Sequence, residues 1–285
     1  MSKVVLVTGA SAGIGRACAD RLAGAGWTVV GASRRGTSSG AGWSGLVMDV
    51  DDDESVAAGV GDVLARHGGV DAVVLAAGWG IAGAVEHTPI HDARAQLETN
   101  FLGVVRVTQA VLPHMRRSGG GRIVVISSIG GAVGIPFQAF YSASKFALEG
   151  WGEALSYEVA PFGIGVTLLQ PGNVRTDFTD SRKMSVAEGA GDHYDAAVAA
   201  AVGRMARDEA DGVAPDAVAR KVERVLQVKR APLRVSVGKA AERAGLLGKK
   251  VLPDRVFTAA ARRSLGVRRT AGLREPGAAT RRMTE

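Results

Sequence analysis

A tyrosine and a lysine lie four residues apart, at Tyr141 and Lys145. We expect residues 140–159 to be helical, so both side chains should project from one face of that helix. A free tyrosine has a pKa near ~10, and a neighbouring ammonium lowers it by stabilising the phenolate. The pair therefore predicts a proton shuttle in which Tyr141 is the proton donor or acceptor.

Two more polar residues are expected close to this pair. Ser128 follows an apolar run at residues 122–127 and precedes Tyr141 by thirteen residues. Ligands of parallel sheets bind beyond the carboxyl ends of the strands, so Ser128 should be able to hydrogen-bond a carbonyl oxygen. Its neighbour Ser127 is the alternative. Asn100 falls within a predicted long helix at residues 91–115, where asparagine is unfavourable unless it has a role.

A glycine-rich turn joins the first predicted strand, residues 3–8, to a predicted helix at residues 13–25. Gly9, Gly13 and Gly15 allow a tight turn and close approach of the backbone to a pyrophosphate. The helix N-terminus then presents free N–H groups to that anion. Strand, turn and helix in this order predict a dinucleotide-binding site.

The end of the second predicted strand, residues 28–32, indicates which dinucleotide is bound. An acidic residue there would bind the ribose 2′-hydroxyl of NAD. The chain instead has Ser33, Arg34 and Arg35. Two guanidinium groups with no competing carboxylate favour a 2′-phosphate, which predicts NADP(H).

Apolar strand-like runs alternate with helical patterns as far as residue 172. Further strands are expected at residues 46–48, 72–76, 165–169 and 233–237, with helices at 54–66, 216–229, 239–247 and 254–265. This alternation predicts an α/β fold, a Rossmann-type doubly wound parallel sheet of about seven strands with helices on both faces. We expect one domain at residues 1–265 with a lid insert at about 177–212, and a basic, disordered tail at 266–285.

The motifs together resemble those of the short-chain dehydrogenase/reductase family. The glycine spacing Gly-x-x-x-Gly-x-Gly after Thr8 and the Tyr-x-x-x-Lys pair carry this resemblance, which spans residues 3–178. It implies an enzyme that interconverts a ketone or aldehyde with the corresponding alcohol using NADP(H). The catalytic residues implied are Asn100, Ser128, Tyr141 and Lys145. The cofactor contacts implied are Gly9, Ser11, Gly13, Ile14, Gly15, Ser33, Arg34, Arg35, Asp49, Val50, Ala77, Gly78, Asn100, Tyr141, Lys145, Pro171, Gly172, Val174 and Thr176.

The family also implies how these residues act. Ser128 and Tyr141 bind the carbonyl oxygen as hydride arrives from the nicotinamide, and Tyr141 supplies the proton. Lys145, a water and Asn100 then resupply that proton. One departure concerns the usual Asn-Asn-Ala-Gly after the fourth strand, which here reads Leu-Ala-Ala-Gly and ends at Gly78. We therefore expect the side-chain brace of that strand to be lost, while backbone contact with the ribose is kept.

The substrate side of the site is expected to be apolar. Residues 128–148 look like the branch that contains 17β-hydroxysteroid and retinol dehydrogenases, which favours a steroid-, retinoid- or lipid-like substrate. Met184, His193 and Tyr194 of the lid are candidates for contact with it, although each fits a surface position as well. The predicted substrate contacts are Ile81, Ile135, Phe137 and Met184.

Composition limits the remaining classes. The net charge is +7, and residues 261–285 contain seven arginines against two glutamates. Such a tail can contact nucleic acid or acidic lipid, yet it carries no interleaved aromatic residues, and a solvated terminus is favoured. The single Cys18 allows no intrachain disulfide. We expect a cytoplasmic homodimer or homotetramer with no integral membrane span, no metal and no nucleic-acid partner.

Three alternatives remain at this stage. A non-catalytic NADP-binding sensor with this fold usually lacks the tyrosine or the lysine. A nucleotide-sugar epimerase or dehydratase shares the pair, but it usually has a different glycine spacing and a longer chain. A nucleic-acid or membrane binder would act through the tail. Deletion of residues 267–285 separates this alternative from an oxidoreductase, because an oxidoreductase should stay active without them.

Overall fold

The apolar runs of the chain form a seven-stranded sheet in the order β3-β2-β1-β4-β6-β7-β9, in which all neighbouring strands are parallel. The computed structural model describes residues 2–37, 42–230 and 232–264. The strands of this sheet are β1 (Val4–Thr8), β2 (Thr28–Ser33), β3 (Ser44–Val47), β4 (Ala72–Leu75), β6 (Gly121–Ile126), β7 (Ile164–Pro171) and β9 (Arg234–Val237). The predicted doubly wound α/β fold is confirmed. Strand order reverses between β1 and β4, which opens a crevice at their carboxyl ends.

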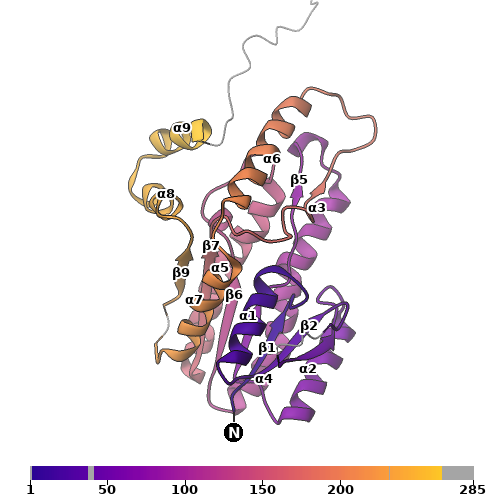
Figure 1. Ribbon diagram of the computed structural model, residues 1–285, viewed down its shortest axis with the longest axis vertical. Helices are drawn as coiled ribbons and strands as arrows, with labels where there is room; N and C mark the ends of the chain where they lie inside the picture. The colour runs from indigo at the N-terminus through magenta and orange to yellow at the C-terminus, as the bar shows by residue number, and fades with distance from the viewer. Residues whose placement is uncertain (1, 38–41, 231, 265–285) are drawn as a thin grey trace, which may run out of the picture.

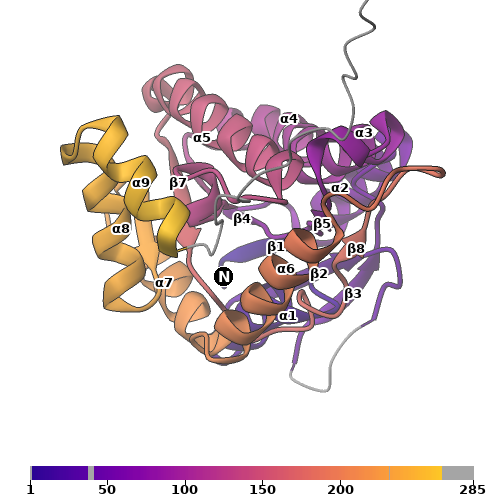
Figure 2. The same ribbon diagram turned by 90° about the horizontal axis from the view of Figure 1, so that it is seen from above.

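Helices cover both faces of the sheet, as Figures 1 and 2 show. One face packs on α2, α4 and α5, and the other packs on α1 and α7. The helices are α1 (Gly13–Gly24), α2 (Asp53–His67), α3 (Ile90–Leu97), α4 (Gly103–Arg117), α5 (Ala139–Val159), α6 (Asp195–Ala210), α7 (Pro215–Gln227), α8 (Ala240–Val251) and α9 (Asp254–Ser264). Since both faces are covered, strands such as β1 and β4 are buried at every residue, and all of these residues are apolar except Thr8.

The helix predicted at residues 91–115 is interrupted. It begins as α3, continues through the π-helical turn η2 (Glu98–Leu102) and resumes as α4. Short π-helical turns inside α-helices frequently lie at functional sites. Asn100 is in this turn, so the interruption lies where the sequence suggested a functional asparagine.

The segment predicted as a lid contains a short strand and a helix. The strand β8 (Lys183–Met184) pairs with β5 (Ile81–Ala82), and α6 follows after a loop. Shorter 3-10 turns are η1 (Val85–His87), η3 (Ile129–Gly131) and η4 (Ala160–Phe162). Among the described residues no helix is both long and apolar enough to cross a bilayer. The predicted tail at 266–285 lies outside the described residues.

Candidate active site

The glycine turn brings β1 into close contact with the loop after β4. A Cβ atom on Gly9 would lie 2.8 Å from the backbone of Ala77, and one on Gly15 would lie 2.3 Å from the carbonyl oxygen of Gly9. Both positions therefore require glycine. Helix α1 starts after Ala12, which offers no side-chain cap, and its first turn has no acidic residue. The free N–H groups at this helix start are thus left for an anion.

The hydroxyl of Thr8, at the end of β1, holds the loop after β4, for which the sequence predicted no side-chain brace. Thr8 Oγ1 accepts hydrogen bonds from the backbone N–H groups of Ala76 and Ala77, at 3.1 and 3.2 Å. Thr8 is 1% exposed, so water cannot take its place. The expectation that β4 has no side-chain brace is wrong, because the preceding strand supplies one.

The adenosine end of the site fits a phosphorylated ribose. The Ser33 hydroxyl is buried there, and none of the described residues hydrogen-bonds it. Arg34 and Arg35 are exposed beside it, and neither forms an ion pair with any described residue. A buried hydroxyl is costly when unpaired, and a 2′-phosphate would accept from it as well as from a guanidinium. These residues therefore fit NADP(H).

A cavity of about 1100 Å³ runs from this end to the predicted catalytic residues. Every predicted cofactor contact except Asn100 lines it, as do Ser128 and Ile135. The structure thus brings together, along one cavity, residues from the loops after β1, β2, β3, β4, β6 and β7 and from the start of α5.

Tyr141 and Ser128 meet at the inner end of the cavity. Ser128 lies in the loop after β6, close enough to the Tyr141 phenol to influence its pKa. Burial raises the pKa of Tyr141, and the nearby Ser128 hydroxyl opposes that rise. The expectation that Lys145 lowers this pKa is therefore not met in the protein alone, because desolvation of the phenolate outweighs the charges around it. Bound NADP⁺ would add a positive ring beside the phenol.

Lys145 lies one helical turn from Tyr141. Its Nζ donates a 2.9 Å hydrogen bond to the carbonyl of Ile126 and is 5.7 Å from the centre of the Tyr141 ring. Burial lowers the pKa of Lys145 to about 8, although the carboxylate of Glu149 opposes the shift. Glu149 is itself held by Ser127 at 2.6 Å. Ser127, the alternative to Ser128, therefore orients a neighbour of Lys145.

Asn100 is completely buried behind this pair. Its Oδ1 accepts from the N–H of Trp79 at 3.0 Å, and its Nδ2 donates to Ser144 Oγ at 3.2 Å. A Cβ atom on Gly78 would lie 3.1 Å from Asn100 Oδ1 and 3.9 Å from Lys145 Nζ. Asn100 is thus close to Lys145 without lining the cavity, which suits a positioning role.

Three of the four predicted substrate contacts lie outside the cavity lining, and only Ile135 is within it. Ile81 is buried in the pairing of β5 with β8. Met184 is 49% exposed and is absent from the lining, although its neighbour Lys183 is part of it. Phe137 has a φ of 61°, unusual for a bulky residue, and its carbonyl accepts from Gly83.

The two other lid candidates are also peripheral. The Tyr194 hydroxyl donates to Glu86 at 2.8 Å. His193 is exposed near Asp192.

Sequence reasoning missed the residues that surround Tyr141 on the substrate side. Phe178 packs against the Tyr141 ring with centres 5.7 Å apart. Gln138 is 4% exposed, and its amide nitrogen has no hydrogen-bond partner among the described residues. Met205 and Glu209 of α6 complete this part of the cavity lining. Nothing in the charge pattern of residues 195–210 separates these two from solvated neighbours.

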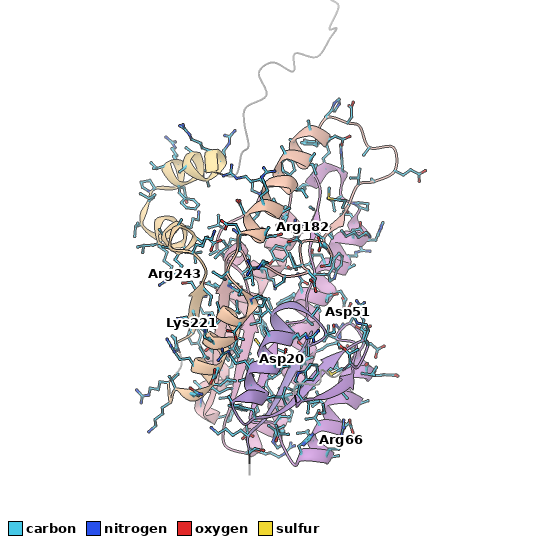
Figure 3. The ribbon with its side chains drawn as sticks, viewed as in Figure 1. Asp20, Asp51, Arg66, Arg182, Lys221 and Arg243 are labelled. Carbon is cyan, nitrogen blue, oxygen red and sulfur yellow. The ribbon has the colours of Figure 1, made fainter. Side chains whose placement is uncertain are left out.

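A buried ion pair connects the lid segment to α6. Arg182 pairs with Glu209, whose carboxylate also accepts from Thr179. Figure 3 marks Arg182 beside α6. Glu209 raises the pKa of Tyr141 and Arg182 lowers it, so both charges lie within electrostatic range of the phenol. Among the described residues no cluster of side chains is suited to hold a metal ion.

Comparison with known proteins agrees with this geometry. The profile of the short chain dehydrogenase family matches residues 3–186. A 3-ketodihydrosphingosine reductase of Bacteroides thetaiotaomicron is 38% identical over 260 residues, which cover 91% of this chain and 97% of the relative. Human 17-beta-hydroxysteroid dehydrogenase type 1 is 39% identical over 62% of this chain and 58% of its own.

Solved structures are similar as well. A short-chain dehydrogenase of Streptomyces avermitilis is 35% identical with a TM-score of 0.76, covering 94% of this chain and 99% of its own. An alcohol dehydrogenase of Thermococcus sibiricus, solved with 5-hydroxy-NADP, is 27% identical with a TM-score of 0.66, covering 84% and 97%.

Proposed function

Because the chain belongs to the short-chain dehydrogenase family, we propose that it is an NADP(H)-dependent oxidoreductase that interconverts a hydrophobic ketone and its alcohol. The observation that carries this proposal is the meeting of Ser128, Tyr141 and Lys145 at one end of a cavity whose other end holds Ser33 and Arg34. NADPH, when bound, supplies the hydride. The protein supplies the rest of the chemistry.

The residues divide that work in a way their contacts support. Ser128 and Tyr141 hydrogen-bond the substrate oxygen, where negative charge develops during reduction. Tyr141 then transfers its phenolic proton to that oxygen. Lys145, protonated below a pKa of about 8, stabilises the resulting phenolate. Asn100 holds the loop of Trp79 against this end of the site.

NADP(H) is proposed over NAD(H) on three features. The end of β2 has no carboxylate, the buried Ser33 hydroxyl has no partner in the part of the chain that the structure describes, and two exposed arginines lie beside it. The Thermococcus sibiricus enzyme, solved with an NADP derivative, is consistent with this choice.

The substrate class is proposed from the cavity next to Tyr141. Val133, Ile135, Phe178 and Met205 give it an apolar lining, while the unpaired amide of Gln138 offers one polar contact. The Glu209 carboxylate lies in the same part of the lining as a second polar group. Apolar walls with these polar groups fit a long-chain ketone with a polar head near the carbonyl. The Bacteroides thetaiotaomicron relative is named for a ketone of this kind.

The test is oxidation of NADPH and of NADH in the presence of a ketone panel. The panel holds 3-ketodihydrosphingosine, a steroid ketone, retinal, a water-soluble aliphatic ketone and a nucleotide sugar. We expect turnover of ketones with NADPH, highest with the long-chain amino ketone. Turnover of the nucleotide sugar alone would favour the epimerase alternative, and NADPH binding with no turnover of any member would favour the sensor.

We further propose that the protein is a homo-oligomer. Leu102, Phe146 and Tyr157 lie 40%, 45% and 67% exposed on η2 and α5. Apolar side chains so placed on the outer side of these helices are suited to burial against a second copy. Sedimentation equilibrium of the full chain tests this proposal.

A further inference from the structure

The C-terminal hairpin, defined here as α8 and α9 with the turn between them, lies outside the layers of the fold. Figures 1 and 2 both show it on the far side of β9, beyond the edge of the sheet. Helix α8 has no buried residue. The described side chains of α9 are likewise all at least partly exposed. Hydrophobic contact with the sheet therefore does not account for this hairpin.

Four aliphatic side chains gather where the two helices join. Leu247, Val251, Leu252 and Val256 are 61%, 69%, 43% and 53% exposed. Leu247 and Val251 are four residues apart and so share one face of α8. Lys249 of α8 pairs with Asp254 of α9 at 3.0 Å. This ion pair spans the turn between the two helices, with Val251 just before the turn and Val256 just after it. The result is an exposed aliphatic patch.

The hairpin carries much of the net positive charge of the protein. Residues 240–264 contain six Lys and Arg against two Asp and Glu. The preceding 239 residues contain twenty-four of each, so the net charge of +7 arises entirely at and after residue 240. Within the hairpin, Arg243, Lys250 and Arg255 are exposed near the aliphatic patch, and Figure 3 labels Arg243 on α8.

We propose that the C-terminal hairpin is a docking surface for an anionic lipid bilayer. Exposed aliphatic residues flanked by Lys and Arg on amphipathic helices are the chemistry that inserts into the headgroup region of such a membrane. A second copy is disfavoured as the partner, since two hairpins that each hold six Lys and Arg against two Asp and Glu repel. Nucleic acid is disfavoured because the exposed side chains of the patch are Leu and Val, which offer no rings on which bases can stack. The aromatic ring of the hairpin, Phe257, is partly buried and already has Lys249 Nζ 5.2 Å from its centre.

The hairpin is fixed to the rim of the active site. Glu242 of α8 accepts hydrogen bonds from the backbone and side-chain nitrogens of Asn173, at 2.9 and 2.7 Å. Asn173 and Gly172 line the cavity, and Gly172 N–H donates to Val237 at the end of β9. A bilayer held by the hairpin would thus lie next to the cavity. The docking proposal is independent of the proposed activity, because it requires no turnover.

The experiment is flotation of the full-length protein with two kinds of vesicle, one of phosphatidylcholine alone and one that also contains phosphatidylglycerol. We expect flotation with the anionic vesicles, and a loss of binding as salt screens the charges. The double variant Val251→Asp/Val256→Asp should lower the bound fraction at least about tenfold. In the double variant Lys250→Glu/Arg255→Glu, each of the two substitutions should lower the bound fraction about fivefold. Val85→Asp, an equally exposed aliphatic site on the body, is the matched control.

Circular dichroism and gel filtration first establish that each variant is folded, and NADPH turnover is measured separately. Equal flotation with both kinds of vesicle, or none with either, overturns the proposal. So does a double variant that changes only the oligomeric state, which would assign the patch to a second copy. Binding of RNA by a protein that does not bind vesicles would mean that the positive charge of the hairpin serves nucleic-acid binding.

Discussion

The Nζ of Lys145 lies 5.7 Å from the centre of the Tyr141 ring, one helical turn away on α5. Both groups are buried, and burial reverses the order of their pKa values: the pKa of the phenol rises above its ordinary value of 10, while that of the ammonium falls from 10.5 to about 8. Transfer of a proton from the Lys145 ammonium to the Tyr141 phenolate is therefore more favourable than between a free lysine and a free tyrosine, which suits the return of the proton that Tyr141 gives to the substrate.

Replacing Tyr141 by phenylalanine removes the proton donor while keeping the ring against Phe178. We expect kcat/KM for ketone reduction to fall by roughly 10²–10⁴, with NADPH binding preserved when it is measured by fluorescence titration. Tyr157→Phe is the matched control, because that tyrosine lies on the same helix, is 67% exposed and hydrogen-bonds Glu153. Substantial turnover by Tyr141→Phe would remove this tyrosine from the reaction.

Replacing Lys145 by methionine should slow reduction and also alter stability. Burial lowers the pKa of Lys145 from 10.5 to about 8. Between these values the unfolded chain binds more protons than the folded chain, so the free energy of unfolding of the wild type rises with pH. The cost of the buried charge is fully present below the folded pKa and is about 3 kcal/mol at most. Lys145→Met removes this cost and so gains stability, but it also removes the hydrogen bond to Ile126, which offsets part of that gain.

Urea denaturation across this pH window measures the effect. The stability difference between Lys145→Met and the wild type should shift in favour of the wild type as pH rises from about 8 to 10.5. Lys229→Met, at an exposed site, is the surface control. A difference that stays constant with pH would mean that the ammonium is not desolvated.

Much of the site was predictable because it depends on backbone geometry. The turn at Gly9 and Gly15 needs residues without a Cβ, and the helical spacing of Tyr141 and Lys145 places both on one face. The substrate side was not predictable in this way. Phe178 and Glu209 reach Tyr141 only because a loop and α6 fold across the sheet from distant parts of the chain. Met184 was misplaced because a two-residue strand gives no usable periodicity.

Replacing Arg34 by alanine should change the choice between cofactors. A charge-assisted hydrogen bond to phosphate contributes about 1.5–3 kcal/mol, so kcat/KM with NADPH should fall about 10- to 100-fold. The value with NADH should fall far less, because NADH has no 2′-phosphate. Arg66→Ala is the control, since that arginine pairs with Asp62 on α2. An unchanged ratio of the two values would argue against a 2′-phosphate contact at this position.

Replacing Thr8 by valine tests the brace between β1 and β4. The variant keeps the shape of the side chain but leaves the N–H groups of Ala76 and Ala77 without their acceptor. A buried donor without a partner costs about 1–3 kcal/mol, so the free energy of unfolding should fall by about 2–4 kcal/mol, with lower affinity for NADPH. Thr8→Ser keeps the acceptor and should retain most of both. Losses in Thr8→Ser that Thr8→Val does not show would mean that the threonine methyl group, and not its hydroxyl, supports the cofactor loop.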